Sequence, residues 1–197
     1  AGLLDRAERL LLDLVKESGE QRVVSLRHLL EIYTSEKEWQ KAIDSAVQLL
    51  PRKTLLGGAG ASTDSGKGQQ VAVALAHFYC ELAASKLSGG ELSAARKLLD
   101  QALSQDSLCV RASIMLGDLE YQGGHYKQAV KALCRVRQQD ADYLPETVVP
   151  LRKCYQQLND ESALKTYLQD CLGENPPPKL LLAVAEDICE AGGREAA

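Results

Sequence analysis

The chain has 197 residues, 45% of them apolar and 25% charged, which is an ordinary globular composition and excludes global disorder. Lys and Arg number 23 and Asp and Glu 27, so the net charge of −4 provides no basic surface for nucleic acid or an anionic membrane. Leucine (33 residues) and alanine (24) dominate, whereas aromatic residues make up 5%. Leucine and alanine favour helices, so the composition predicts an all-α fold.

Two absences bear on the compartment. No apolar run reaches the roughly 18 residues that a membrane-spanning helix needs, and the first residues do not resemble a signal peptide, so we expect a soluble chain. The six cysteines form no C-x-x-C pair, and several fall in the apolar rhythm of helices, where a reduced cysteine packs as a small apolar residue. This usage predicts free thiols in a reducing, cytosolic environment.

A repeat of 34 residues organises the chain. Residues 90–103 and 124–137 share a glycine, a large residue two positions later, an alanine three further on, and apolar residues four and seven beyond that alanine. This period is typical of the tetratricopeptide repeat, a pair of antiparallel helices in which a small residue on the second helix lets the two helices pack closely. Gly117 is expected on a first helix, at the point where the second helix approaches it. The predicted packing positions are Ala7, Ala42, Ala95, Gly117, Ala129 and Ala163.

The repeat predicts one array over residues 1–197, a right-handed superhelix of stacked helical hairpins. Residues 1–20 fit a second helix alone, and residues 178–197 a first helix that begins after three prolines and ends near two glycines. Both ends therefore cut through a repeat, as we expect of a fragment of a longer protein. The complete units are expected at 23–50, 76–109, 110–143 and 144–177.

The 34-residue spacing of the packing alanines is interrupted once. Ala42 and Ala95 are 53 residues apart, 19 more than one period, and the surplus predicts a flexible, Gly- and Ser-rich inserted loop over residues 51–70. Gly66 and Lys67 suggest a phosphate-binding loop, but the glycine and the Ser/Thr that flank that motif are missing and no strand precedes it. A plain linker is the favoured interpretation.

Catalytic and metal-binding patterns are weak. His77, Cys80 and Glu81 have ligand-like helical spacing, but one histidine and one cysteine fall short of the four ligands of a zinc site. His28 and His125 have no recognisable nucleophile beside them. The sequence therefore predicts no catalytic residue, no metal ligand and no cofactor.

The remaining class of function is recognition of another protein. In this repeat the first helices line a concave surface, and positions 2, 5, 9 and 12 of each unit point into it. Arginine, tyrosine and acidic residues there suit a peptide-binding groove, although a simply solvated position is an open alternative for each of them. The groove lacks the asparagine of repeats that grip a C-terminal carboxylate. Its predicted residues are Arg27, Glu31, His77, Cys80, Arg111, Asp118, Tyr121, Arg152 and Tyr155.

Four sequence blocks are more specific than the repeat consensus. Residues 38–44 (EWQKAID), 76–83 (AHFYCELA), 110–117 (VRASIMLG) and 154–158 (CYQQL) resemble the lipopolysaccharide assembly protein B family, and residues 182–191 fit it too. The resemblance covers nearly the whole chain except residues 51–68, which form a longer segment than we expect of the family.

The resemblance implies an adaptor on the cytoplasmic face of the bacterial inner membrane. Such an adaptor promotes degradation of the deacetylase LpxC by the membrane protease FtsH, restrains lipopolysaccharide synthesis, and is opposed by a YejM-type regulator. The family also has a membrane anchor and a rubredoxin-like iron or zinc module, which we do not expect within these residues. A scaffold that gathers envelope-assembly proteins is the alternative, and a metal-dependent enzyme is disfavoured. Exposed apolar faces at the two ends favour self-association as a homodimer.

Overall fold

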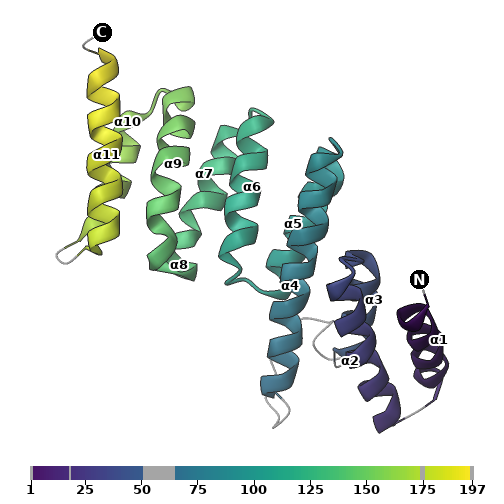
Figure 1. Ribbon diagram of the computed structural model, residues 1–197. Helices are drawn as coiled ribbons and strands as arrows, with labels where there is room; N and C mark the ends of the chain where they lie inside the picture. Colours follow the sequence, from purple (N-terminus) through teal and green to yellow (C-terminus); the bar gives the residue numbers. More distant parts are fainter. Residues whose placement is uncertain (1, 18, 51–64, 174–175, 196–197) are drawn as a thin grey trace. The chain divides into compact units, whose positions relative to one another are not determined.

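A computed structural model describes residues 2–17, 19–50, 65–173 and 176–195. Within these residues the chain is α-helical with one short 3₁₀ turn and no strand, so the predicted all-α class is confirmed (Figure 1). The chain forms two compact units, one of residues 1–106 and one of residues 107–197, and each is described by itself. We call the first helix of a hairpin helix A and the second helix B.

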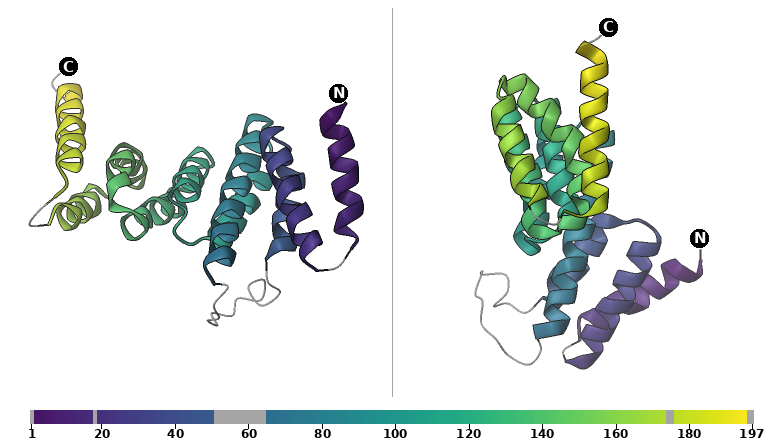
Figure 2. Two further views of the ribbon diagram at one scale, coloured as in Figure 1. Left: turned by 60° about the horizontal axis from the view of Figure 1, so that its bottom comes forward. Right: turned by 90° about the vertical axis from the view of Figure 1, so that its left-hand side faces the viewer.

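Unit one holds two helical hairpins and one further helix. In the hairpins, α2 pairs with α3 and α4 with α5, while α1 packs against α2 (Figure 2). Ile43 and Ala46 of α3 share a buried cluster with Leu75 of α4, which joins the hairpins. The helices are α1 (Leu3–Val15), α2 (Glu20–Ser35), α3 (Trp39–Leu49), α4 (Ser65–Ser88) and α5 (Leu92–Gln105).

Unit two repeats this arrangement. Helix α6 pairs with α7, α9 pairs with α10, and α11 packs against α9. Ala129 and Leu133 of α7 share a cluster with Leu151 of α9. The elements are α6 (Val110–Gln122), α7 (Tyr126–Cys134), α8 (Val136–Gln139), the 3₁₀ turn η1 (Ala141–Tyr143), α9 (Leu144–Leu158), α10 (Glu161–Leu172) and α11 (Pro178–Glu195).

The four turns between helix A and helix B are built alike. Each has a residue with positive φ one or two positions after the last residue of helix A, and two of these are glycines, Gly90 (φ 76°) and Gly124 (φ 75°). In each turn the next residue donates its N–H to a carbonyl five positions back, for example His125 to Glu120 at 2.8 Å. This bond satisfies a carbonyl that the helix end would leave without a partner, so the same C-terminal cap recurs in every hairpin.

Small residues lie where the repeat predicts them. Ala42, Ala95 and Ala129 are fully buried, and a Cβ added to Gly117 would lie 2.6 Å from Cγ of Leu133. These contacts let helix B approach helix A closely, as predicted. Ala7 and Ala163 occupy the same register position but are only half-buried.

Several boundaries differ from the predicted ones. Helix α4 begins at Ser65, so residues 65–70 are helical and not part of a loop, because Val71, Ala72 and Leu75 pack against α3 and stabilise the preceding turn. The rest of the predicted loop, residues 51–64, lies outside the described residues. Helix α11 begins at Pro178, as expected, but continues through the two glycines to Glu195.

Candidate protein-binding surface

Helix α6 presents three of the predicted groove residues in unit two. Its register positions 4, 8 and 11 are buried, and Gly117 at position 8 meets α7 directly. Arg111 and Asp118 are exposed and Tyr121 is half-buried, so the register positions named by the sequence point away from the hairpin interior. The structure thus brings these three side chains together on one helix.

Asp118 interacts with a residue that the sequence analysis missed. Partial removal of water raises the pKa of the Asp118 carboxyl, although its side chain keeps an exposed side, and the positive charge of Lys153 on α9 opposes that rise. Lys153 is 35 residues beyond Asp118, one more than the repeat period, so the register positions used in the sequence analysis did not include it. The pair adds both signs of charge to the surface.

Tyr121 and Tyr155 anchor this surface to the core. Both pack on the buried cluster that joins α7 and α9, and the Tyr121 ring lies 5.6 Å from the ring of Tyr126. Burial raises the pKa of the Tyr155 hydroxyl, and the side chain keeps part of its surface in solvent. Half-buried tyrosines are suited to hold a partner because little side-chain freedom remains to be lost on binding.

Arg152 does not belong to the surface, contrary to the sequence prediction. Its side chain is 9% exposed and its Nε donates to Oδ1 of Asp187 on α11, whose side chain is 5% exposed. Helix α11 packs over this part of α9, with Leu180 and Val184 against Val148. The neighbouring helix therefore buries register position 9 of α9, and the arginine stabilises the contact between α9 and α11.

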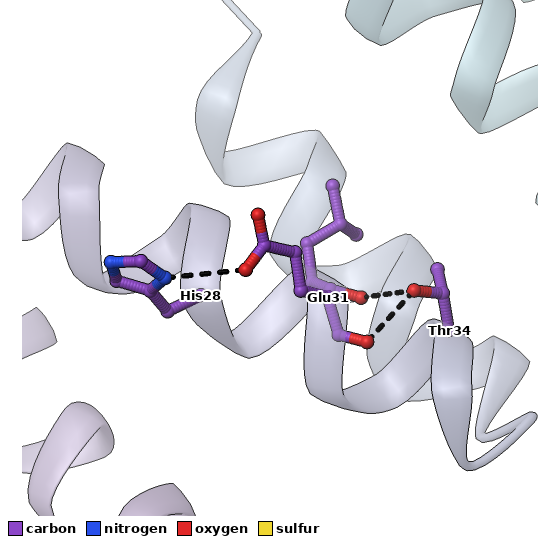
Figure 3. A network of polar contacts seen from close by, with 4 residues as sticks. His28, Glu31 and Thr34 are labelled. Atoms are coloured by element: carbon purple, nitrogen blue, oxygen red, sulfur yellow. Dashed lines mark hydrogen bonds and ion pairs between the residues drawn. The ribbon is translucent and has the colours of Figure 1, made fainter.

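In unit one, α2 presents Arg27 and Glu31, both exposed. Nδ1 of His28 lies 3.3 Å from Oε2 of Glu31, one turn along the helix (Figure 3). Thr34 donates its hydroxyl hydrogen back to the carbonyls of Leu30 and Glu31, each at 2.9 Å. This stretch of α2 therefore carries an exposed row of polar groups, and it includes His28, which the groove prediction omitted.

Of the two groove residues predicted on helix α4, only one is exposed. His77 is exposed, but Cys80 is fully buried, so a partner cannot reach its thiol. Between them, the ring of Phe78 stacks on Trp39 of α3 at 6.2 Å. Cys80 is therefore a core residue and not a groove residue.

A polar network in unit one was also missed. The Tyr33 hydroxyl donates to Oε1 of Glu8 at 2.9 Å, and Nζ of Lys41 lies 3.3 Å from the same oxygen. This hydrogen bond is the main cause that lowers the pKa of Glu8, and burial together with Glu8 raises the pKa of Tyr33 to about 12. The network joins α1, α2 and α3, and no spacing in the sequence signals it.

The described residues do not fit a metal ion. Nowhere in the part of the chain that the structure describes do three His, Cys, Asp or Glu side chains converge. All six cysteines are free thiols, and Cys80, Cys109 and Cys154 are buried. Among the helices whose residues are described, none is both long and apolar enough to cross a membrane.

Comparisons with known proteins place this geometry in context. A family model described as tetratricopeptide repeat matches residues 86–146. Over 197 residues the chain is 38% identical to lipopolysaccharide assembly protein B of Escherichia coli (strain K12), and over 196 residues it is 36% identical to the protein of that name from Haemophilus influenzae (strain ATCC 51907 / DSM 11121 / KW20 / Rd). These matches cover 100% of this chain but 47% and 46% of the relatives, so the chain spans about half the length of the curated relatives it matches.

Two solved structures resemble this chain at low sequence identity. A crystal structure of MamA has a TM-score of 0.49 at 16% identity and covers 94% of this chain and 91% of that one. A second crystal structure of MamA protein has a TM-score of 0.46 at 14% identity, covering 84% of this chain and 93% of that one.

Proposed function

We propose that this chain, a tetratricopeptide-repeat member of the lipopolysaccharide assembly protein B family, is a non-catalytic adaptor in lipopolysaccharide assembly. The observation that carries the proposal is the identity of 36–38% to proteins of that name along the whole chain. Helical repeats recognise partners through exposed helix A positions, so the work of the chain is to hold other proteins.

The surface on α6 and α9 supports a docking role. We define the α6/α9 surface as Arg111, Asp118, Tyr121, Lys153 and Tyr155. It combines two half-buried tyrosines with charges of both signs, a composition that suits an irregular or helical segment of a partner protein.

In its finer form, the proposal is that the adaptor promotes proteolysis of LpxC by FtsH at the cytoplasmic face of the inner membrane. FtsH would perform the chemistry, and a YejM-type regulator would oppose the adaptor. The family resemblance is the support for these partners and for this location. We assign no metal or cofactor to this chain.

The test is the half-life of LpxC in cells whose own homologue is replaced by the full-length parent protein. Arg111→Glu, Tyr121→Ala and Lys153→Glu change the α6/α9 surface, and we expect them to prolong the half-life of LpxC at equal adaptor abundance. The matched controls Lys131→Ala and Lys165→Ala remove exposed charges from helix B, and we expect degradation at the unaltered rate.

Unchanged degradation in all three surface variants would remove the α6/α9 surface from the proposal. The alternative, a scaffold that gathers envelope-assembly proteins, predicts instead that complete depletion of the protein leaves the half-life of LpxC constant. These two measurements separate a wrong surface from a wrong function.

A further inference from the structure

Helix B of the hairpin α6/α7 is basic along its whole length. Residues 126–139, which form α7, Arg135 and α8, contain four cations and no acidic residue. In each of the other hairpins, helix B exposes at least one carboxylate: Asp44 on α3, Asp100 on α5 and Asp170 on α10. The stretch 126–139 therefore has a positive charge of its own, in a chain whose net charge is −4.

Three of these cations form one row on the surface, which we call the basic row: Lys127, Lys131 and Arg135. All three are exposed and stand four residues apart, and Arg135 has helical φ and ψ (−63° and −30°), so the row continues from α7 towards α8. Side chains at this spacing share one helix face, with their Cβ atoms about 5–6 Å apart. Among the described residues, none of the three side chains has an ion-pair or hydrogen-bond partner.

The basic row opposes the stability of its own helix. Like charges four residues apart repel each other, and a cation in the first turn is disfavoured by the partial positive charge of the helix N-terminus. Lys127 is the second residue of α7, and the first turn of α7 has no acidic residue. No contact within the described residues offsets this cost, so the row is suited to an anionic group from outside the chain.

Exposed apolar side chains lie at the α8 end of the basic row. Leu108 is 61% exposed and Tyr143 is 44% exposed. Nε2 of Gln139, the last residue of α8, donates to the carbonyl oxygen of Ser107 at 2.7 Å, which holds the turn with Leu108 beside α8. Tyr143 ends the 3₁₀ turn η1, which packs against α8. The row therefore leads to a place where an apolar side chain can bind.

We infer that the basic row, together with Leu108 and Tyr143, binds an acidic segment of another protein that has a large apolar residue beside its carboxylates. The carboxylates lie on the three cations, and the apolar side chain packs on Tyr143 and Leu108. In an extended segment every second side chain points to the same side, about 6.5 Å from the next. This spacing is close to that of the row, so alternate residues of the segment each meet one cation.

Helix α10 favours a protein segment over a larger polyanion. Arg137 of α8 donates from a guanidinium N–H to the carbonyl oxygen of Asp170 at 2.8 Å, so the last turns of α10 lie against α8. The side chains of Asp170 and Glu161 on α10 are exposed. A flat anionic membrane or a nucleic-acid duplex would meet these carboxylates as well as the row, whereas a single extended segment is narrow enough to follow the row alone.

This inference goes beyond the proposed function. The basic row lies on helix B and shares no residue with the α6/α9 surface. Lys131→Ala is a control for that surface, so loss of the row should leave the half-life of LpxC unaltered. Failure of either proposal therefore leaves the other standing.

The test measures binding of a synthetic peptide to the 197-residue protein by fluorescence anisotropy. The labelled peptide has six consecutive glutamates and one phenylalanine at each end, and a second peptide has six glutamines in their place. We expect the glutamate peptide to bind at ~0.1 M salt, with an affinity that falls as salt is added. The glutamine peptide should bind at least about tenfold more weakly.

Charge reversal tests the basic row directly. Lys127→Glu, Lys131→Glu and Arg135→Glu together should weaken binding of the glutamate peptide at least about tenfold, because three attractions become repulsions. The matched control reverses three exposed lysines outside the row, so it makes the same change in net charge, and it should bind within about threefold of the unaltered protein because distant charges are screened. These control lysines are Lys37, Lys97 and Lys179.

Two further variants separate charge, apolar contact and folding. Tyr143→Ala should weaken binding of the phenylalanine-ended peptide about fivefold and leave binding of six glutamates without phenylalanine unaltered. Lys127→Gln with Lys131→Gln removes like-charge repulsion, so it should raise the midpoint of urea denaturation while it weakens binding. Circular dichroism checks that every variant is folded.

Four results would overturn the inference. They are equal binding of the glutamate and glutamine peptides, equal losses in the row variant and its matched control, unaltered binding of the phenylalanine-ended peptide by Tyr143→Ala, and tighter binding to another polyanion. For the last, vesicles that contain phosphatidylglycerol and a DNA duplex are the probes. Tighter binding to either that is lost in the row variant would assign the row to a membrane or to nucleic acid.

Discussion

The hairpins α6/α7 and α9/α10 follow the same register but fill it with different residues. At position 8 of helix A, α6 has Gly117 where α9 has Leu151, and four residues beyond the anchoring alanine α7 has Leu133 where α10 has Tyr167. Helices α6 and α7 are the more closely apposed pair, and their anchoring alanine is fully buried, whereas Ala163 of α10 is half-buried. Between these two hairpins, the smaller residue at position 8 of helix A accompanies the closer contact of the two helices.

The exposure of position 9 of helix A differs even more between the two hairpins. Asp118 of α6 is exposed, whereas Arg152 of α9 is buried under α11 and paired with Asp187. The hairpin itself does not decide this outcome, because the covering helix comes from outside it. A groove position is available to a partner only where no neighbouring helix A packs over it.

The largest expected effect follows from that buried pair. Arg152→Ala leaves the carboxylate of Asp187 buried without its partner, which costs about 3–5 kcal/mol of unfolding free energy. Asp118→Ala, at the same register position of α6, should change the unfolding free energy by no more than about 0.5 kcal/mol. Urea denaturation of both variants measures the contrast, and equal losses would contradict it.

Replacing both charges sharpens the same comparison. Arg152→Met combined with Asp187→Leu replaces both buried charges with apolar side chains, so it should recover most of the stability lost in Arg152→Ala. A double variant as unstable as the single one would mean that the ion pair is not the source of the loss.

The next effect tests the close approach of α6 and α7. Gly117→Ala gains about 1 kcal/mol of helix propensity, but overpacking of a core costs about 1–3 kcal/mol. The new Cβ would lie 2.6 Å from Cγ of Leu133, which is fully buried and would have to shift, so we expect a net loss of about 1 kcal/mol in urea denaturation.

Gly66 of α4 is the matched control for that substitution. A Cβ on Gly66 would meet nothing within 4 Å, so Gly66→Ala should stabilise the protein by up to about 1 kcal/mol. If Gly117→Ala stabilised the protein as well, the close contact would not require glycine.

The sequence predicts the hairpins, and it predicts the packing of Gly117 and Ala129, because these features depend on contacts inside one repeat. Burial of Arg152 was not predictable from its own repeat, since the covering helix α11 lies outside the hairpin to which Arg152 belongs. Cys80 was assigned to the groove from its register position alone, although a reduced cysteine in the apolar rhythm of a helix packs as a small apolar residue. The start of α4 was missed for a related reason. Gly66 and Gly68 suggest a loop by composition, and the packing of Val71 and Leu75 against α3 outweighs that local preference.

A smaller effect distinguishes two tyrosines. The Tyr167 hydroxyl of α10 is buried beside the thiols of Cys134 and Cys171 and makes no well-oriented hydrogen bond, and burial raises its pKa. Tyr167→Phe should therefore change the unfolding free energy by less than about 0.5 kcal/mol. Tyr33→Phe removes the hydrogen bond to Glu8 and should cost about 1 kcal/mol at neutral pH.

The pH dependence of the Tyr33 effect has a definite sign. The hydrogen bond lowers the pKa of Glu8 in the folded protein, so this stabilisation is present above the unfolded value of 4.5 and is lost as the pH falls through the folded value. The difference in unfolding free energy between the unaltered protein and Tyr33→Phe should therefore become smaller in acid. A difference in unfolding free energy that stays constant from neutral pH to pH ~3 would contradict this role of Glu8.

The smallest effect concerns the exposed position 9 of α6. Burial raises the pKa of Asp118 and Lys153 opposes the rise, so Lys153→Ala should raise that pKa further, whereas Lys153→Arg should leave it nearly unchanged. An NMR titration of the Asp118 carboxyl measures the shift, with Lys165→Ala on α10 as the control.

A folded pKa above the unfolded one makes ionised Asp118 destabilising, so Lys153→Ala should lower the unfolding free energy above that pKa and leave it unaltered in acid. If the Asp118 pKa does not respond, its carboxyl and Lys153 do not share one surface, and the α6/α9 surface loses its pair of opposite charges.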